Sequence, residues 1–197
     1  HAHCGLMIYQ GDNWPAEYRG KVFMNNIHGA CINMDVLERK GSGFVGRHGP
    51  NPIKFNDVWS QIVNFQEGPD GAVYFIDWYD KNQCHSNDAN QHDRNNGRIF
   101  KVSYGEPKFA KVDFQELSDT QLFQQTLNTS SWHWRHALRL LHERTIRKGK
   151  ASLYDDYLKL DQSKMPFRFE IEKFDERELR MRFLWILHAI GYSFADN

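Results

Sequence analysis

The sequence predicts β-structure followed by α-helices, with the β-part forming blades of a β-propeller. Up to about residue 106, short runs rich in aromatic and β-branched residues alternate with Gly, Asn, Asp and Pro, as in strands joined by tight turns. After about residue 115 the hydrophobic pattern changes to the helical period of about 3.6 residues. A faint internal repeat of about 50 residues is typical of propeller blades.

The strand predictions rest on apolar runs that are bounded by turn residues. The GPDG sequence at 68–71 is a clear hairpin signal, because Pro and Gly stand where a tight turn favours them. The predicted strands cover residues 5–10, 20–27, 30–37, 43–47, 60–66, 72–78 and 98–104. A propeller usually has about four to eight blades, so two blades alone should form open sheets with exposed edges.

The helical part is predicted from capping residues and apolar stripes. Ser118 with Gln121 forms a capping box ahead of one helix, and Asp175 with Glu178 caps the last one. Helices are predicted over residues 131–148, 151–160 and 176–190. Paired amphipathic helices of this length are typical of α-solenoid repeats. A small helical bundle packed on the sheet is the alternative.

Composition argues against several classes of protein. Lys plus Arg and Asp plus Glu are balanced at 25 each, so charge gives no support to a nucleic-acid partner or an anionic membrane partner. No apolar run approaches the roughly 18 residues of a membrane span, and no signal peptide is recognised. The cysteines form no CxxC or CxxCH pattern, so neither the usual zinc spacing nor a covalent haem site is predicted.

The segment between residues 77 and 100 is the main candidate site. Our functional hypothesis is that Asp80, His85 and Asp93 surround a cation or a polar substrate, with His92 as a fourth ligand. Strand alternation would put Trp78 and Asp80 on one face and their neighbours on the other. The alternative is a structural loop, in which SNDAN and DRNNG form Asx-turns closed by glycine.

Two further residues are weaker candidates. His28 follows two asparagines at a strand end, where channel-lining residues are found, and it is the one candidate for a catalytic role. Arg98 could contact an anionic cofactor, although an Arg that opens a strand is usually solvated. His133 and His136 are assigned to the core and a solvated face of their helix rather than to a metal or haem site.

Three phrases carry a family resemblance: HAHCGLMIYQGDNWPAEYRGKVFMNNIHG, GPDGAVYFIDWYD and NNGRIFKVSYG. They resemble the last blades of the six-bladed propeller in a bacterial membrane-bound dehydrogenase family, related to glucose and sorbosone dehydrogenases. In that family HEAT-like helical repeats and a cytochrome c domain commonly follow the propeller. The helical phrases SSWHWRHALRLLHERT and LRMRFLWILHAIG resemble its first repeat helices.

The resemblance implies a division of the chain and a function. Residues 1–106 would be the last two blades, 107–115 a linker and 116–197 a HEAT-like segment. The chain would be a fragment of a secreted or periplasmic, quinone-dependent sugar or polyol dehydrogenase that passes electrons to the cytochrome c domain. Calcium and pyrroloquinoline quinone are the implied cofactors, with Asp80, His85 and Arg98 near them. A non-catalytic scaffold that binds carbohydrate or protein is the alternative, and we expect the fragment alone to be inactive.

Overall fold

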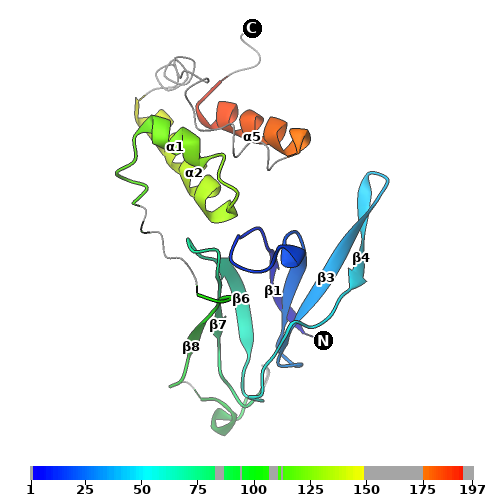
Figure 1. Ribbon diagram of the computed structural model, residues 1–197. Coiled ribbons are helices and arrows are strands. Elements are labelled where there is room, and N and C mark those ends of the chain that lie inside the picture. The colour runs from blue at the N-terminus through cyan, green and yellow to red at the C-terminus, as the bar shows by residue number, and fades with distance from the viewer. Residues whose placement is uncertain are drawn as a thin grey trace. The chain divides into compact units, whose positions relative to one another are not determined.

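The chain divides into two compact units, His1–Lys108 and Phe109–Asn197, in the computed structural model (Figure 1). The structure describes residues 2–82, 87–93, 95–106, 111, 113–148 and 175–192. Strands occupy the first unit and helices the second, which confirms the predicted order of β-structure before α-structure. The helix predicted over 151–160 lies outside the described residues.

The first sheet is an antiparallel meander. It contains β1 (His3–Ile8), β2 (Val22–Asn26), β3 (Cys31–Lys40) and β4 (Gly43–His48) in that spatial order, and β5 (Ile53–Lys54) also pairs with β3. All six residues of β4 are exposed, and Figure 1 shows β3 and β4 as a long hairpin. The sequence analysis missed β5, because two residues are too few to show an alternating pattern.

The second sheet contains β6 (Ile62–Glu67), β7 (Val73–Asp77) and β8 (Arg98–Val102), again antiparallel and in chain order. The predicted GPDG turn joins β6 to β7: the Gly68 amide donates to the Ala72 carbonyl, and the Gly71 amide donates to the Gly68 carbonyl. A short 3-10 helix, η1 (Ala16–Tyr18), precedes β2, and η2 (Ala89–Gln91) lies between β7 and β8.

The two sheets share one hydrophobic core. Strands of both sheets contribute to it: Met7 is buried in β1, and Val73 and Phe75 are buried at alternate positions of β7. The other buried members of the core are Tyr9, Trp14, Phe23, Ile32, Met34, Ile62 and Phe65. Burial of this set removes large apolar side chains from water, which is the main force that holds the sheets together.

The Tyr9 hydroxyl connects the two sheets at one end of this core. It accepts hydrogen bonds from the amides of Asn13 (3.0 Å) and Trp14 (2.7 Å), and it donates to the carbonyl of Gly71 (2.9 Å). Gly71 has a φ of +71°, and a Cβ there would lie 2.3 Å from the Asp12 carboxylate. The turn after β1 and the GPDG turn are therefore in direct contact.

The helical unit contains α1 (Asp119–Gln125), α2 (Ser131–Lys148) and α5 (Glu176–Ala189). The capping box at Ser118 and the Asp175 cap are both present, as predicted. Phe114 is buried in the core of this unit, although the sequence analysis assigned it to the linker. The other buried core residues are Leu122, Phe123, Ala137, Leu140, Leu141, Ile186 and Ile190.

Arg182 is a charged residue of α5 that is nevertheless buried. It is 3% exposed, and its guanidinium donates to the carbonyls of Thr126 and Asn128 at 3.1 and 2.8 Å. The guanidinium also lies over the Trp134 ring. Arg182 thus satisfies carbonyls of the loop that joins α1 to α2, which fixes α5 against that loop.

We predict that Tyr9→Phe destabilises the sheet unit. The substitution leaves two amides and one carbonyl without the hydroxyl, and a buried unsatisfied group costs roughly 1–3 kcal/mol, so the free energy of unfolding should fall by about 2–4 kcal/mol. Urea denaturation followed by tryptophan fluorescence measures this change. Tyr104→Phe is the matched control, because Tyr104 is 67% exposed; equal losses in both variants would contradict the prediction.

The same hydroxyl predicts a loss of stability at high pH. Burial raises the pKa of Tyr9 to about 12, against the opposing effect of the Trp14 and Asn13 amides. Because the folded-state pKa is raised, the stabilisation is complete below pH ~10, the ordinary tyrosine value, and is lost as the pH rises towards 12. The stability difference between wild type and Tyr9→Phe should therefore shrink over this interval.

Candidate functional site

Asp80 is held in place just after the end of β7. Its side chain is buried and the residue is 3% exposed. Its amide donates to the Trp59 carbonyl at 3.1 Å, and its carbonyl accepts from the Gln61 side chain at 2.6 Å. These backbone contacts to the segment that enters β6 fix the position from which the carboxylate acts.

The Asp80 carboxylate orients the loop that follows β7. One oxygen pairs with His92 Nδ1 at 2.8 Å, and the other accepts from the Asp93 amide at 3.2 Å. Burial alone would raise the pKa of Asp80, but the hydrogen bonds from His92 and the Asp93 amide outweigh it, so this pKa lies below its usual value. A carboxylate on Nδ1 fixes the orientation of a histidine ring and raises the basicity of its Nε2.

The buried Asp77 and the half-buried Arg98 form a second pair beside Asp80. Arg98 donates to Asp77 through Nε at 3.1 Å and reaches Asp57 at 3.2 Å. Its guanidinium lies 3.9 Å from the centre of the Tyr79 ring. Asp77 also accepts from the Ser60 hydroxyl and from the amides of Gln61 and Tyr79. Arg98, predicted as a cofactor contact, is thus already paired with two carboxylates, which raise its pKa against the lowering effect of burial.

The predicted strand alternation is wrong beyond Asp77. Strand β7 ends there, and Tyr79 has a φ of +55°, a conformation that a bulky side chain rarely adopts. The chain therefore changes direction, so that Trp78 is 66% exposed whereas Asp80 is buried. The Asp77 carboxylate holds the Tyr79 amide at 2.9 Å, and this contact stabilises the unusual backbone conformation.

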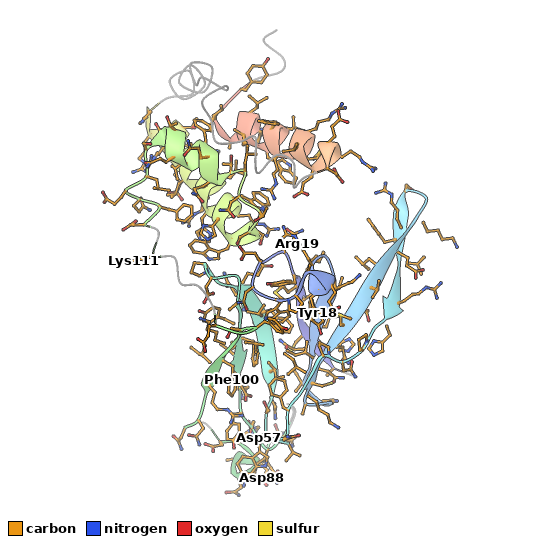
Figure 2. The ribbon with its side chains drawn as sticks, in the orientation of Figure 1. Tyr18, Arg19, Asp57, Asp88, Phe100 and Lys111 are labelled. Atoms are coloured by element: carbon orange, nitrogen blue, oxygen red, sulfur yellow. The ribbon has the colours of Figure 1, made fainter. Side chains whose placement is uncertain are left out.

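A cavity of about 980 Å³ lies against this end of the second sheet. Its polar lining comes from Gln61, Asp77, Asp80, Asn82, His92, Asp93 and Arg98, and its apolar lining from Ile27, Val63, Ile76, Trp78 and Ile99. Figure 2 shows Asp57 and Asp88 at this end of the sheet unit. The cavity thus joins an apolar sheet face to a polar rim that the loops supply.

The other residues predicted for the site are not brought together with Asp80 among the described residues. His28 is exposed in the turn between β2 and β3, and of that turn it is Ile27 that lines the cavity. His85 lies outside the described residues, as does Cys84. Among the residues that the structure does describe, no group of three His, Cys, Asp or Glu side chains is arranged to hold a metal ion. The four-residue metal hypothesis stays a prediction.

The turn contacts expected for a structural loop are present at two of the acids. The Asp88 side chain accepts from the Asn90 amide at 2.9 Å and caps η2. The Asp93 carboxylate accepts from the Asn95 amide at 3.1 Å and from the Asn96 side chain at 2.8 Å. These contacts are the local turns that Asp and Asn favour.

Sequence reasoning missed the groups that fix Asp77 and Asp80. Ser60 and Gln61 lie 17 and 16 residues before Asp77, as their hydrogen bonds record, and no local pattern links them to it. Trp78 was recognised only as part of a strand. The signal that could have marked Trp78 as a site residue is its position at the end of a strand, beside several polar residues.

Fold and site together define a class of protein: two antiparallel sheets with a polar cavity at the strand ends, followed by a helical unit. A family model described as "Domain of unknown function (DUF7133)" matches residues 1–106. Since this match covers more than half of the 197 residues, the chain belongs to the DUF7133 family. Neither a curated protein nor a solved structure gives a significant match. Among the described residues, we find no helix with the length and hydropathy that a membrane span requires.

We predict that Asp80→Asn loosens the loop over residues 87–93. The substitution removes the charge that holds His92 and weakens acceptance from the Asp93 amide, so amide exchange in this loop should become roughly tenfold faster. Hydrogen–deuterium exchange read by mass spectrometry measures the change. Asp35→Asn is the control, because Asp35 forms the exposed pair with His48.

The pH dependence has a defined sign. Because the pKa of Asp80 is lowered by its partners, the Asp80 carboxylate should hold His92 and the Asp93 amide at and above the ordinary aspartate pKa of about 4. These contacts should be lost only as the pH falls below that value and through the lowered pKa. Exchange in Asp80→Asn should show no such transition, and equal exchange in both proteins at neutral pH would contradict the prediction.

Proposed function

We propose that the sheet unit is part of a β-propeller of the sugar or polyol dehydrogenase type, and that the cavity beside Asp80 binds its polar ligand. The observation that carries the proposal is the buried Asp80 carboxylate, which holds His92 at the rim of a large cavity. A carboxylate-oriented imidazole is suited to accept a proton from a hydroxyl group or to hydrogen-bond it.

The outer faces of both sheets support the propeller. Leu6 and Ile8 of β1 are 66% and 44% exposed on the face opposite the core, and Ile76 and Ile99 are 44% and 77% exposed on the second sheet. Each sheet therefore carries apolar side chains on two faces, of which the described residues cover one. Sheets with two apolar faces are stacked on both sides, as propeller blades are, so we propose that a further sheet covers the outer face of β1, whereas Ile76 and Ile99 line the cavity.

The helical unit supports a repeat architecture in the same way. Met181, Leu184 and Trp185 of α5 are 44%, 42% and 41% exposed. In a HEAT-like array the next repeat would cover such a face, since stacked repeats bury what one unit cannot. The pairing of α1 with α2 through the shared core would then be the helical hairpin of one repeat.

The chemistry of the site follows from its residues. Oxidation of an alcohol to a carbonyl removes one proton from the hydroxyl and one hydride from the carbon. Among the described residues that line the cavity, His92, held by Asp80, is a group that can take the proton. A quinone cofactor would supply the hydride acceptor.

Calcium does not fit the described side chains at this site. Calcium takes about six to eight oxygen ligands, whereas both Asp80 oxygens are used by His92 and the Asp93 amide, and both Asp93 oxygens accept from asparagines. We therefore assign neither calcium nor pyrroloquinoline quinone a position here. The quinone, the cytochrome c electron acceptor and a periplasmic or secreted location are parts of the proposal that rest on the family resemblance.

A non-catalytic carbohydrate-binding scaffold is the second candidate. Asp77 and Arg98 neutralise each other, and Asp93 holds its own turn. Such saturated groups give a rigid binding surface without a further charged group for chemistry. Binding alone would not separate the two candidates, but turnover in the presence of quinone would.

The test is a binding measurement on the 197-residue chain. We expect isothermal titration calorimetry to detect neutral sugars or polyols, and His92→Ala to weaken binding by about tenfold, the loss of about 1.4 kcal/mol in a hydrogen bond. His28→Ala is the control, because His28 is exposed and the cavity lining includes its neighbour Ile27 instead. No binding across a broad carbohydrate panel would contradict the proposal.

A closed propeller is needed to separate the enzyme from the scaffold. With calcium and the quinone added to a protein that carries the remaining blades, reduction of an artificial electron acceptor on a bound sugar would support the dehydrogenase. We expect the chain by itself to bind without turnover, because two sheets cannot enclose a substrate as a closed propeller does.

A further inference from the structure

We infer that Trp78 is a stacking platform that makes the cavity select ring-shaped, uncharged sugars over open-chain polyols. The inference rests on the proposed function and specifies the ligand class of the same site. It is carried by the position of Trp78, by the way its backbone is held and by the charge of the groups around it.

Trp78 is a large apolar side chain that the fold holds in solvent. It is 66% exposed and lines the cavity. Its amide donates to the Gln61 carbonyl at 3.0 Å, and the next residue, Tyr79, is locked at a φ of +55° by the Asp77 carboxylate and the Arg98 guanidinium. A strained, well-fastened backbone beneath an exposed indole costs folding free energy, which points to a function for the side chain.

Two other exposed aromatic side chains have a ring or cation partner within the described residues. Trp185 in the helical unit stacks on Trp134, with ring centres 5.6 Å apart and planes 8° apart. Phe44 on the β3–β4 hairpin lies under the Arg39 guanidinium. Ile76 and Ile99 line the same cavity but lie within strands, whereas Trp78 lies one residue beyond the last residue of β7.

The chemistry around the indole fits a pyranose ring. One face of such a ring presents C–H groups, whose partial positive charge suits the negative face of an aromatic system. The hydroxyls at the ring edge need donors and acceptors, and Asn82, His92 and Asp93 line the same cavity. An open-chain polyol has the hydroxyls but no flat C–H face, so it should gain less from Trp78.

The local charge excludes anionic ligands. Arg98 is the cation in the cavity lining, and it is paired with Asp77 and Asp57. Asp80 and Asp93 add negative charge, and the lowered pKa of Asp80 keeps its carboxylate ionised at neutral pH. Sugar phosphates and uronic acids should therefore bind more weakly than the neutral sugars.

The experiment compares three proteins: wild type, Trp78→Ala and Trp78→Phe. Each is titrated with a neutral hexopyranose and with the hexitol of the same configuration, by calorimetry. We expect Trp78→Ala to bind the pyranose about tenfold or more weakly, and to lose the preference for pyranose over hexitol. Trp78→Phe keeps an aromatic face and should keep most of the affinity and the preference. Trp185→Ala is the matched tryptophan control and should change neither.

The outcomes distinguish this inference from the proposed function. If Trp78→Ala keeps both affinity and ring preference while His92→Ala loses affinity, the stacking role of Trp78 is wrong, and the proposal that the cavity binds the ligand is still supported. If Trp78→Ala weakens pyranose and hexitol equally, ring selection is also wrong. If wild type binds no sugar, the proposed function fails, and this inference fails with it. Far-ultraviolet circular dichroism and the behaviour of Trp78→Phe establish that the variants are folded.

Discussion

The Tyr9 hydroxyl is the interaction on which the rest of the sheet unit depends. Its three hydrogen bonds join the turn after β1 to the GPDG turn that begins β7. Trp14, held by this hydroxyl, donates through its indole to the Val102 carbonyl at 3.0 Å and so also fixes the end of β8. The geometry of β7 and β8 determines where Asp77, Asp80 and Arg98 lie, so one buried hydroxyl at one end of the core positions the polar cavity at the other. Because Tyr9 is fully buried, water cannot replace these hydrogen bonds.

Asp77 and Asp80 are three residues apart and have different roles. The residue type alone therefore does not identify which acid belongs to the site. Asp77 is a structural anchor: its oxygens are used by Arg98, Ser60 and the backbone that turns after β7. Asp80 is equally buried, but its oxygens hold the loop that carries His92 to the cavity. Replacing a buried ion pair by apolar residues is often neutral or favourable. The retention of polar groups at this strand end is therefore better explained by their control of loop and ring orientation than by stability.

The features that the sequence predicted well depend on local contacts. The limits of α2 and the caps at Ser118 and Asp175 follow from side chains that bond their own backbone within three residues. The antiparallel strands follow from alternation and from a turn that needs Gly71 at a positive φ. The site was harder, because Asp80 meets His92 across 12 residues and Arg98 meets Asp57 across 41. Asp80 was therefore assigned as a ligand and Arg98 as a cofactor contact, although each is engaged by other protein groups. Tyr79 could not be predicted, because nothing in the local pattern indicates that Arg98 and Asp77 compensate its backbone strain.

The order of these constraints along the chain has a consequence for function. The buried Tyr9 hydroxyl fixes the GPDG turn, which precedes β7. Strand β7 ends at Asp77, whose buried carboxylate fixes the restricted backbone of Tyr79, the residue next to Trp78. A site built in this way loses little conformational entropy when a ligand arrives, because its side chains are ordered in advance. Pre-organisation of this kind is of most use where each contact is weak, as with neutral hydroxyls and C–H groups. The rigid strand end is for that reason a physical argument for the neutral sugar ligand that we propose, independent of the residue types that line the cavity.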